Sequence, residues 1–282
     1  MKYILSNLKK LFFRIISNYK INDTIFIVII NLFFLFMNRK HRFRLSNLGQ
    51  DCPKYKVVDD NNQSEKFFGF RKQGLMAFTN GISQRGYDIG NAYLLNEIDF
   101  KEGDLIFDIG ANTGDLKIFF DNKNINIEYY GFEPGKIEFE SLRKNNPKTN
   151  LFNIALGNNN HILPFYYNPE YGDSSLVEMK GYNDIYKVDV ITLSYFIKSQ
   201  NLTKSKIKLI KLEAEGYEPE ILNGIDNFIE NIEYISADLG FERGLDQTST
   251  FPEAKNILIK RNFEIVSINK KRKVVLFKNL KF

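Results

Sequence analysis

The sequence predicts an α/β domain with a mostly parallel sheet of seven strands, which ends in an antiparallel hairpin and is preceded by a helical N-terminal extension. From residue 103 onward, short β-branched runs alternate with helical patterns, which is typical of a parallel sheet covered by helices on both faces. Only five polar residues separate the last two runs, too few for a crossover helix, so these strands should pair antiparallel. Residues 1–44 carry apolar side chains at helical spacing.

Seven runs in the body have the length and composition of buried strands. They are residues 105–109, 127–132, 151–155, 207–213, 232–237, 264–268 and 274–277. Helical patterns occupy residues 113–122, 136–145, 192–200, 218–230 and 251–261. Upstream, residues 55–58 and 67–70 flank a polar turn and predict a hairpin, with a helix to follow over 91–98. We therefore divide the chain into an N-terminal helical segment (1–50), a cap (51–100) and the main domain (101–282).

The N-terminal segment predicts a basic amphipathic helix and a second apolar helix. Residues 4–19 place apolar side chains three and four positions apart, and residues 25–37 are apolar except for Asn31. These thirteen residues would cover roughly 20 Å of a ~30 Å hydrocarbon core, so a spanning helix is not expected. We expect residues 1–44 to bind a membrane surface at its cytoplasmic face; the alternative is a helical pair packed on the body as a lid or oligomer interface. The basic residues 39–42 stand where a signal peptide would need a small-residue cleavage site.

The net positive charge of the chain is confined to this segment. Residues 1–50 hold nine Lys and Arg and one acid, Asp23, which gives +8 and leaves −3 of the whole-chain +5 for residues 51–282. We therefore expect no nucleic-acid partner, and the Lys and Arg residues of 270–273 are expected to form a solvated turn. A single cysteine, Cys52, excludes an intrachain disulfide and fits a cytoplasmic protein. No spacing of histidines or acids predicts a metal site.

A glycine-containing loop follows the first strand of the main domain. Asp108 ends the strand, Gly110 and Gly114 bracket the turn, and Asn112 stands where a dinucleotide fingerprint has its second glycine. This disfavours a pyrophosphate ligand, whereas a carboxylate at the strand end suits a cationic group such as the amino-acid part of S-adenosylmethionine. Glu133 ends the second strand, where nucleoside-binding folds place the carboxylate that binds the ribose hydroxyls. We expect these five residues to bind the cofactor.

Four separated motifs resemble the FkbM family of S-adenosylmethionine-dependent methyltransferases. They are DIGANTG (108–114), GFEP (131–134), DSS (173–175) and KLEAEGYE (211–218) followed by LNG (222–224), and the resemblance covers roughly residues 85–245. It implies a class I, Rossmann-like methyltransferase fold, S-adenosylmethionine as cofactor, and O-methylation of a hydroxyl on a saccharide, glycolipid or related natural product. The chain departs from the family's K-x-D-x-E-G pattern at Glu213, which stands in the Asp position.

Polar residues at the ends of the fourth and fifth strands supply candidates for catalysis and acceptor binding. Lys211, Glu213 and Glu215 end the fourth strand, which should lie beside the strand of Asp108. Methyl transfer to an alcohol needs an aligned oxygen and a base, and either Glu213 or Glu215 is expected to be that base. The alternative is that these charges only form a salt-bridged strand end. The residues expected to bind the acceptor are Ser174, Ser175, Asp238, Glu242 and Arg243.

Two other functions fit parts of the sequence. An NAD-dependent sugar-modifying oxidoreductase would use a similar fold, but the loop lacks the middle glycine at position 112. A non-catalytic, membrane-docked scaffold would keep the nucleoside fold, bind cofactor through Asp108 and Glu133, and turn over no acceptor.

Overall fold

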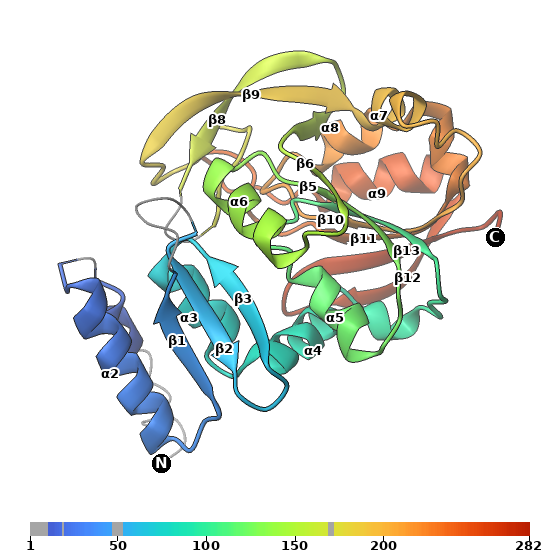
Figure 1. Ribbon diagram of the computed structural model, residues 1–282. Coiled ribbons are helices and arrows are strands. Elements are labelled where there is room, and N and C mark those ends of the chain that lie inside the picture. The colour runs from blue at the N-terminus through green and yellow to red at the C-terminus, as the bar shows by residue number, and fades with distance from the viewer. Residues whose placement is uncertain (1–10, 19, 47–52, 169–171) are drawn as a thin grey trace.

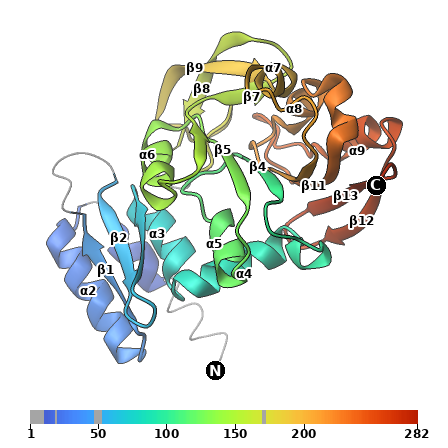
Figure 2. The ribbon, with the colours of Figure 1, turned by 45° about the vertical axis from the view of Figure 1, so that its right-hand side comes forward.

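The computed structural model of the protein describes residues 11–18, 20–46, 53–168 and 172–282. A central seven-stranded sheet carries helices on both faces (Figure 1). A small antiparallel sheet and helix α2 (Asp23–Phe36) lie at the end of the molecule farthest from the C-terminal strands, as Figures 1 and 2 both show. A third, three-stranded sheet is formed by β7 (Ala155–Gly157), β8 (His161–Tyr167) and β9 (Asp184–Thr192).

The central sheet has the strand order β12-β13-β11-β10-β4-β5-β6. Its strands are β4 (Leu105–Ile109), β5 (Glu128–Phe132), β6 (Asn150–Phe152), β10 (Ile207–Leu212), β11 (Ile232–Asp238), β12 (Phe263–Asn269) and β13 (Val274–Asn279). Neighbouring strands are parallel except that β13 pairs antiparallel with both β11 and β12. This confirms the predicted Rossmann-like fold with its antiparallel C-terminal hairpin.

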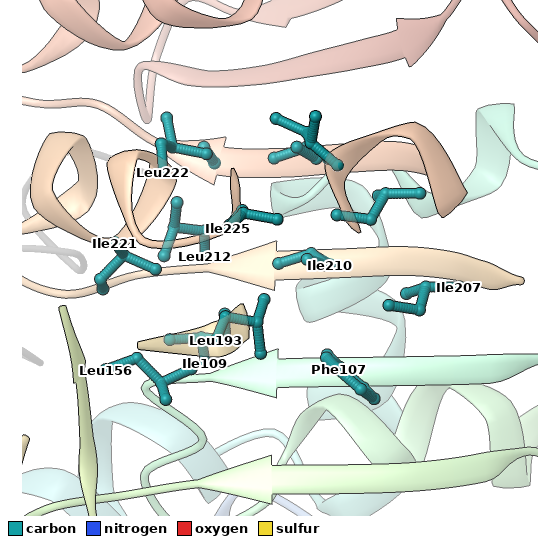
Figure 3. Packing of buried hydrophobic residues seen from close by; sticks show 14 of the residues in the cluster. Phe107, Ile109, Leu156, Leu193, Ile207, Ile210, Leu212, Ile221, Leu222 and Ile225 are labelled. Carbon is teal, nitrogen blue, oxygen red and sulfur yellow. The ribbon is translucent and has the colours of Figure 1, made fainter. Parts of the chain in front are cut away.

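Helices from different parts of the chain cover the two faces of this sheet. One face packs against α4 (Ile82–Ala92), α5 (Leu116–Asn122) and α6 (Lys136–Asn145), and the other against α7 (Leu193–Ser199), α8 (Glu218–Asn223) and α9 (Phe251–Lys260). Along β4 the side chains alternate. Phe107 and Ile109 pack with Leu212 and Leu222 on the α8 face (Figure 3). Ile106 packs on the α5 face. The ends of β4, β5 and β10 are thereby held at one edge.

Three predicted elements differ from the structure. Residues 151–155 are not one strand, because β6 ends at Phe152 and β7 pairs with β9 in another sheet. Residues 218–230 divide into α8 and a 3₁₀ helix, η2 (Asp226–Asn231), and the predicted helix over 91–98 is wrong. Between β3 and β4 the chain instead forms α3 (Arg71–Phe78), α4, which ends at Ala92, and a short 3₁₀ helix, η1 (Leu95–Glu97).

Two glycines explain why α4 escapes a propensity-based prediction. Gly86 and Gly90 disfavour a helix in isolation, but a Cβ at Gly86 would lie 2.9 Å from the backbone of Ile118, and one at Gly90 would lie 2.3 Å from the Phe119 ring. Both neighbours belong to α5. The glycines therefore permit a close α4–α5 contact whose packing outweighs the local propensity.

The N-terminal layer is an antiparallel sheet of β1 (His41–Leu45), β2 (Tyr55–Asp59) and β3 (Ser64–Phe68), covered by Phe26, Ile30 and Phe34 of α2. Residues 39–42 are predicted as a basic flank, yet β1 begins at residue 41 because alternate side chains there are buried in this layer. Of the predicted helix over 4–19, residues 11–16 are helical, while 4–10 and 19 lie outside the described residues. The sheet runs across residue 50, so the three-part division of the chain stays a prediction. Within the described ranges, no helix has the length and apolarity needed to cross a membrane.

Asn31, the one polar residue of the apolar run, closes the free edge of β1. Its Nδ2 donates to the Phe43 carbonyl oxygen at 2.7 Å, and the Phe43 N–H donates to its Oδ1 at 2.9 Å. Because β1 is the outer strand of its sheet, these backbone groups have no strand partner on that side. The amide thus takes the place of a fourth strand.

Replacing this amide tests its structural role. Asn31→Leu is expected to lower the free energy of unfolding by about 1–3 kcal/mol, because the Phe43 backbone loses both partners. Urea unfolding followed by circular dichroism measures the change, with Leu32→Gln on the exposed side of α2 as the control, expected within about 0.5 kcal/mol of wild type. An Asn31→Leu protein as stable as wild type would mean that Asn31 does not support β1.

Candidate functional site

A cavity of about 470 Å³ lies at the carboxyl ends of β4, β5 and β10, the edge at which open α/β sheets bind ligands. The loop after β4 and the end of β5 form one side, and the end of β10 and the loop after β11 form the other. Helix α3 contributes Gln73 and Met76, and residues 172–180 contribute a further wall. This volume is within the ordinary range for small-molecule sites, about 300–1,000 Å³.

The loop after β4 is tightly built. Gly110 has a φ of +73°, and a Cβ there would lie 1.8 Å from the carbonyl oxygen of Glu213, so only glycine lets this loop rest on the end of β10. A Cβ at Gly114 would lie 2.0 Å from Nδ2 of Asn146. Asn112 also has a positive φ, +50°, and its Oδ1 accepts a hydrogen bond from Gln73 Nε2 at 2.6 Å. The loop is therefore fixed by its neighbours before any ligand binds.

Glu133 lies where the loops after β4 and β5 meet. One carboxylate oxygen accepts from the Asn112 N–H at 2.8 Å and the other from the Gly135 N–H at 2.7 Å. Burial, and then the nearby charge of Glu138, raise the pKa of Glu133 to about 8. Glu138 is itself buried, which raises its pKa to about 7, and it accepts a hydrogen bond from Tyr167. The cavity wall on this side thus contains two carboxyls that titrate near neutral pH.

Lys211 lies at the centre of a buried ion-pair network. Its Nζ is 3.2 Å from Asp108 Oδ1 and 3.1 Å from Glu213 Oε2, and it donates to the Gly110 carbonyl oxygen at 2.6 Å. Burial opposes the charge on Lys211, but the Asp108 and Glu213 carboxylates outweigh it and raise the Lys211 pKa. Tyr129 donates to the second oxygen of Asp108 at 2.6 Å. Lys211 therefore holds β10, β4 and the glycine loop in position relative to one another.

This reading predicts that Lys211→Met destabilises the fold. The change leaves Asp108 buried without its cation and leaves Glu213 with Arg272 alone, so the free energy of unfolding should fall by about 3–5 kcal/mol. Lys208→Met is the matched control, because Lys208 belongs to the same strand and pairs with Glu233 nearer to solvent. Urea unfolding should show less than about 1 kcal/mol for the control. A Lys211→Met protein that keeps wild-type stability would contradict the positioning role.

Arg272 corrects the prediction of a purely solvated turn at 270–273. Its Nη2 lies 3.3 Å from Glu213 Oε1 and 3.3 Å from Asp238 Oδ2, and its side chain lines the cavity. Burial opposes ionisation of Glu213, but Lys211 and Arg272 outweigh it and lower the Glu213 pKa. The sequence contained a signal for this position. A strand antiparallel to β11, such as β13, begins at the edge where the parallel strands end, so the turn just before it, with Arg272, lies beside the cavity.

Glu215 contrasts with Glu213 although both line the cavity. Its backbone has a φ of +49°, so the strand has already turned and the two side chains diverge. Within the described part of the chain, its carboxylate makes no hydrogen bond or ion pair. Burial and the charges of Glu242, Glu213 and Asp173 raise its pKa well above the usual range. The site therefore holds one carboxylate that is paired with two cations, Glu213, and one carboxylate with a raised pKa and no ion-pair partner among the described residues, Glu215.

Glu218 fixes this turn and was missed by the sequence analysis. Its Oε1 accepts from the Ala214 N–H at 2.8 Å and the Gly216 N–H at 3.2 Å, while Thr250 donates to its Oε2 at 3.0 Å. The side chain is buried in the first turn of α8. An acid just after a glycine turn, at the start of a helix, was the available signal.

The five residues predicted to bind the acceptor are placed differently from one another. Ser174, Ser175 and Glu242 line the cavity, although Ser175 Oγ is held by the Glu215 carbonyl oxygen at 2.8 Å. Asp238 and Arg243 are not among the lining residues: Asp238 pairs with Arg272, and Arg243 forms a bidentate pair with Glu220 at 2.6 and 2.9 Å. In the described residues, no three His, Cys, Asp or Glu side chains are grouped to hold a metal ion.

Comparison with known proteins identifies the family to which the chain is related. The family model described as "Methyltransferase FkbM domain" matches residues 108–265, more than half of the chain. The 31-O-demethyl-FK506 methyltransferase FkbM of Streptomyces tacrolimicus is 34% identical over 53 residues, which are 19% of this chain and 20% of that protein. The chain thus matches only a fifth of that relative's length.

The chain also resembles solved structures at low identity. A SAM-dependent methyltransferase from Aquifex aeolicus is 13% identical, with a TM-score of 0.39 over 73% of this chain and 89% of that chain. The TrmK enzyme of M. capricolum in complex with S-adenosyl-homocysteine is 13% identical, with a TM-score of 0.37 over 70% and 69% of the two chains.

Proposed function

Because the chain belongs to the FkbM methyltransferase family, we propose that it transfers the methyl group of S-adenosylmethionine to a hydroxyl oxygen of a saccharide, glycolipid or related natural product. The protein is an S-adenosylmethionine-dependent methyltransferase, so neither an NAD-dependent oxidoreductase nor a non-catalytic scaffold is retained. The observation that carries the hydroxyl acceptor is Glu215, a carboxylate in the cavity whose pKa is raised and which has no partner among the described residues. The name of the Streptomyces relative, an O-demethyl-FK506 methyltransferase, supports an oxygen acceptor.

The residues around the glycine loop fit the cofactor. Glu133 presents a carboxylate at the meeting point of two loops, where ribose hydroxyls can donate to it. Asp108 Oδ1 is buried and accepts no hydrogen bond apart from its ion pair with Lys211, so it can take a donor from the amino-acid part. We propose that the Gly110–Gly114 backbone, including Asn112, runs alongside that part. When bound, the cofactor supplies an electrophilic methyl group on a sulfonium.

Glu215 is proposed as the general base. The proton of the acceptor hydroxyl would pass to its carboxylate as the oxygen bonds to the methyl carbon and the methyl–sulfur bond breaks, with S-adenosylhomocysteine as the leaving group. A carboxylate with a raised pKa is the stronger base for this step. Glu213 is a weaker base, because Lys211 and Arg272 both stabilise its ionised form. We therefore assign to Glu213 the positioning of Lys211 and Arg272, and to Glu215 the role of the base.

The acceptor side of the cavity favours a neutral, hydroxyl-rich ligand. Asp173, Glu215 and Glu242 all line it, and burial raises the pKa of each. Their oxygens accept hydrogen bonds from hydroxyl groups, and above their raised pKa values their negative charge also repels an anionic acceptor. Phe241 lines the same space with its ring 62% exposed, which offers a flat apolar surface to the C–H face of a sugar ring.

A labelled-methyl assay tests this function. The full chain is incubated with methyl-labelled S-adenosylmethionine and with neutral aryl glycosides, the matching uronic acids, or a short RNA. We expect transfer to the neutral glycosides, weaker transfer to the uronic acids, and a raised KM for Phe241→Ala. Transfer to the RNA, or to an amine added in parallel, with none to the glycosides would overturn the proposal.

We also propose a cytoplasmic location for the enzyme. The single cysteine, Cys52, shows that the fold uses no intrachain disulfide, which supports a reducing compartment. Fractionation of cells that express the full chain tests the location, and recovery outside the cytoplasmic and membrane-bound fractions would contradict it.

A further inference from the structure

Helix α2 presents an apolar stripe that no described residue covers. Ile25, Val28, Leu32, Leu35 and Phe36 recur at helical spacing and are between 52% and 87% exposed. The opposite side of the helix is buried on the small sheet, so α2 is apolar on two sides. Contiguous exposed apolar surface of this kind marks an interaction site rather than ordinary solvent-facing surface.

The neighbouring helical residues 11–16 extend this apolar surface. Phe12 stacks on Phe33 of α2, with ring centroids 4.8 Å apart, while Leu11 and Ile15 are more than half exposed. Both helical segments therefore keep large apolar side chains in solvent. Helix α2 lies at one end of the molecule, beyond β1 (Figure 2).

The charges beside the stripe are positive. Arg42 lines a shallow groove with Val28, Leu32 and Leu35, and Arg44 and Lys40 are exposed nearby in and before β1. The one acid of residues 1–50, Asp23, is already paired with Lys54 and Arg71. A partner for this surface must therefore combine an apolar interior with negative charge.

This requirement distinguishes the possible occupants. A second copy of the chain would bring two segments of +8 against each other, which is electrostatically unfavourable. An anionic bilayer supplies both hydrocarbon for the stripe and phosphate or carboxylate headgroups for the cations, each worth about 1 kcal/mol near the surface. The 14 residues of α2 extend about 21 Å, short of the ~30 Å core, so the helix would lie in the plane of the interface.

We propose that α2 docks the enzyme on an anionic lipid surface, with Ile25, Val28, Leu32, Leu35 and Phe36 inserted among the acyl chains. The docked layer is also part of the catalytic wall, because α3 follows β3 directly and its Gln73 and Met76 line the cavity. Met76 is 72% exposed at that cavity. The element that docks on the membrane and the element that lines the cavity therefore belong to the same N-terminal layer. This arrangement suits a lipid-linked acceptor.

Vesicle sedimentation of the full chain tests this proposal. The vesicles are phosphatidylcholine alone or an equal mixture of phosphatidylcholine and phosphatidylserine. We expect binding to the mixed vesicles, weaker binding to phosphatidylcholine alone, and a further loss when salt is raised. The double variant Leu32→Gln/Leu35→Gln should lower the affinity for the mixed vesicles at least tenfold, and Lys40→Gln/Arg44→Gln should remove the preference for phosphatidylserine.

Controls separate docking from folding and from self-association. Ile259→Gln changes an exposed apolar residue of α9 and should leave vesicle binding unchanged. All variants should keep the wild-type thermal midpoint and affinity for S-adenosylhomocysteine, since none touches the cavity. The proposal is overturned if the wild type binds neither vesicle, if Ile259→Gln loses as much affinity as the double variant, or if ultracentrifugation shows a dimer that Leu32→Gln/Leu35→Gln dissociates.

Discussion

Glu215→Gln is expected to lower kcat by about 10²–10⁴-fold without changing the affinity for S-adenosylhomocysteine. The amide keeps the size of the side chain but cannot take the proton of the acceptor hydroxyl. The wild-type kcat should rise with pH through the raised pKa of Glu215, because only the ionised carboxylate is a base. This rise should be absent from the pH profile of the variant. Steady-state kinetics over a pH series, with calorimetry of the cofactor product, measures both effects.

Glu213→Gln is the matched variant two residues away. Glu213 is held by Lys211 and Arg272, so its change should cost stability and a smaller part of kcat, and should leave the pH dependence in place. The opposite pattern, in which Glu213→Gln removes the pH dependence and Glu215→Gln keeps it, would assign the base to Glu213.

The affinity for the cofactor is expected to depend steeply on pH. Ribose hydroxyls donate hydrogen bonds to the ionised carboxylate of Glu133, whose pKa is raised to about 8 by burial and by Glu138. Each pH unit below that pKa should therefore weaken binding of S-adenosylhomocysteine by about tenfold, and the affinity should level off above it. Glu133→Gln should bind weakly at every pH. Calorimetric titrations from pH 6 to pH 9 or so measure this dependence.

Glu138→Gln provides the control for the cause of this shift. Removing the charge of Glu138 should lower the Glu133 pKa and move the whole affinity curve to lower pH. The sign for stability is opposite: carboxyls whose pKa is raised by folding stabilise the protein at low pH, and this contribution is lost as pH rises through about 7 to 8. The cofactor-free protein should therefore melt at a lower temperature at pH 9 or so than at pH 6. A wild-type affinity that does not change with pH would contradict the role given to Glu133.

Much of the fold was predictable because the body has a strong local signal. The strands at the centre of the sheet, β4, β10 and β11, are short and almost wholly buried, and parallel connection places their carboxyl ends at one edge. The same rule brings Asp108, Glu133 and Lys211 into one cavity from three strands.

The N-terminal half was less predictable because tertiary contacts decide its local structure. Helix α4 forms despite Gly86 and Gly90, and β1 forms in a stretch rich in arginine. Asn31 interrupts an apolar run for a partner twelve residues away, Phe43, which no local pattern reveals. Propensity describes a segment alone, whereas each of these features depends on the element packed against it.

Within the site, the sequence could name the charged residues but not their pairing. Glu213 and Glu215 look equivalent two positions apart, until a positive φ at Glu215 turns one carboxylate away from Lys211. Arg243 was expected to bind the acceptor, yet its guanidinium donates two hydrogen bonds to Glu220. Pairings of this kind depend on side-chain directions at a turn, which residue spacing does not determine.

The most direct test of this account is calorimetric titration of the full chain with S-adenosylhomocysteine at a pH above 8 or so, beside Glu133→Ala. The account predicts micromolar binding to the wild type, about −8 kcal/mol, and at least a tenfold weaker affinity for the variant. Thermal melting of both proteins confirms that they are folded. Absence of binding to the folded wild type, or equal affinity of the two proteins, would contradict the assignment of this cavity to the cofactor.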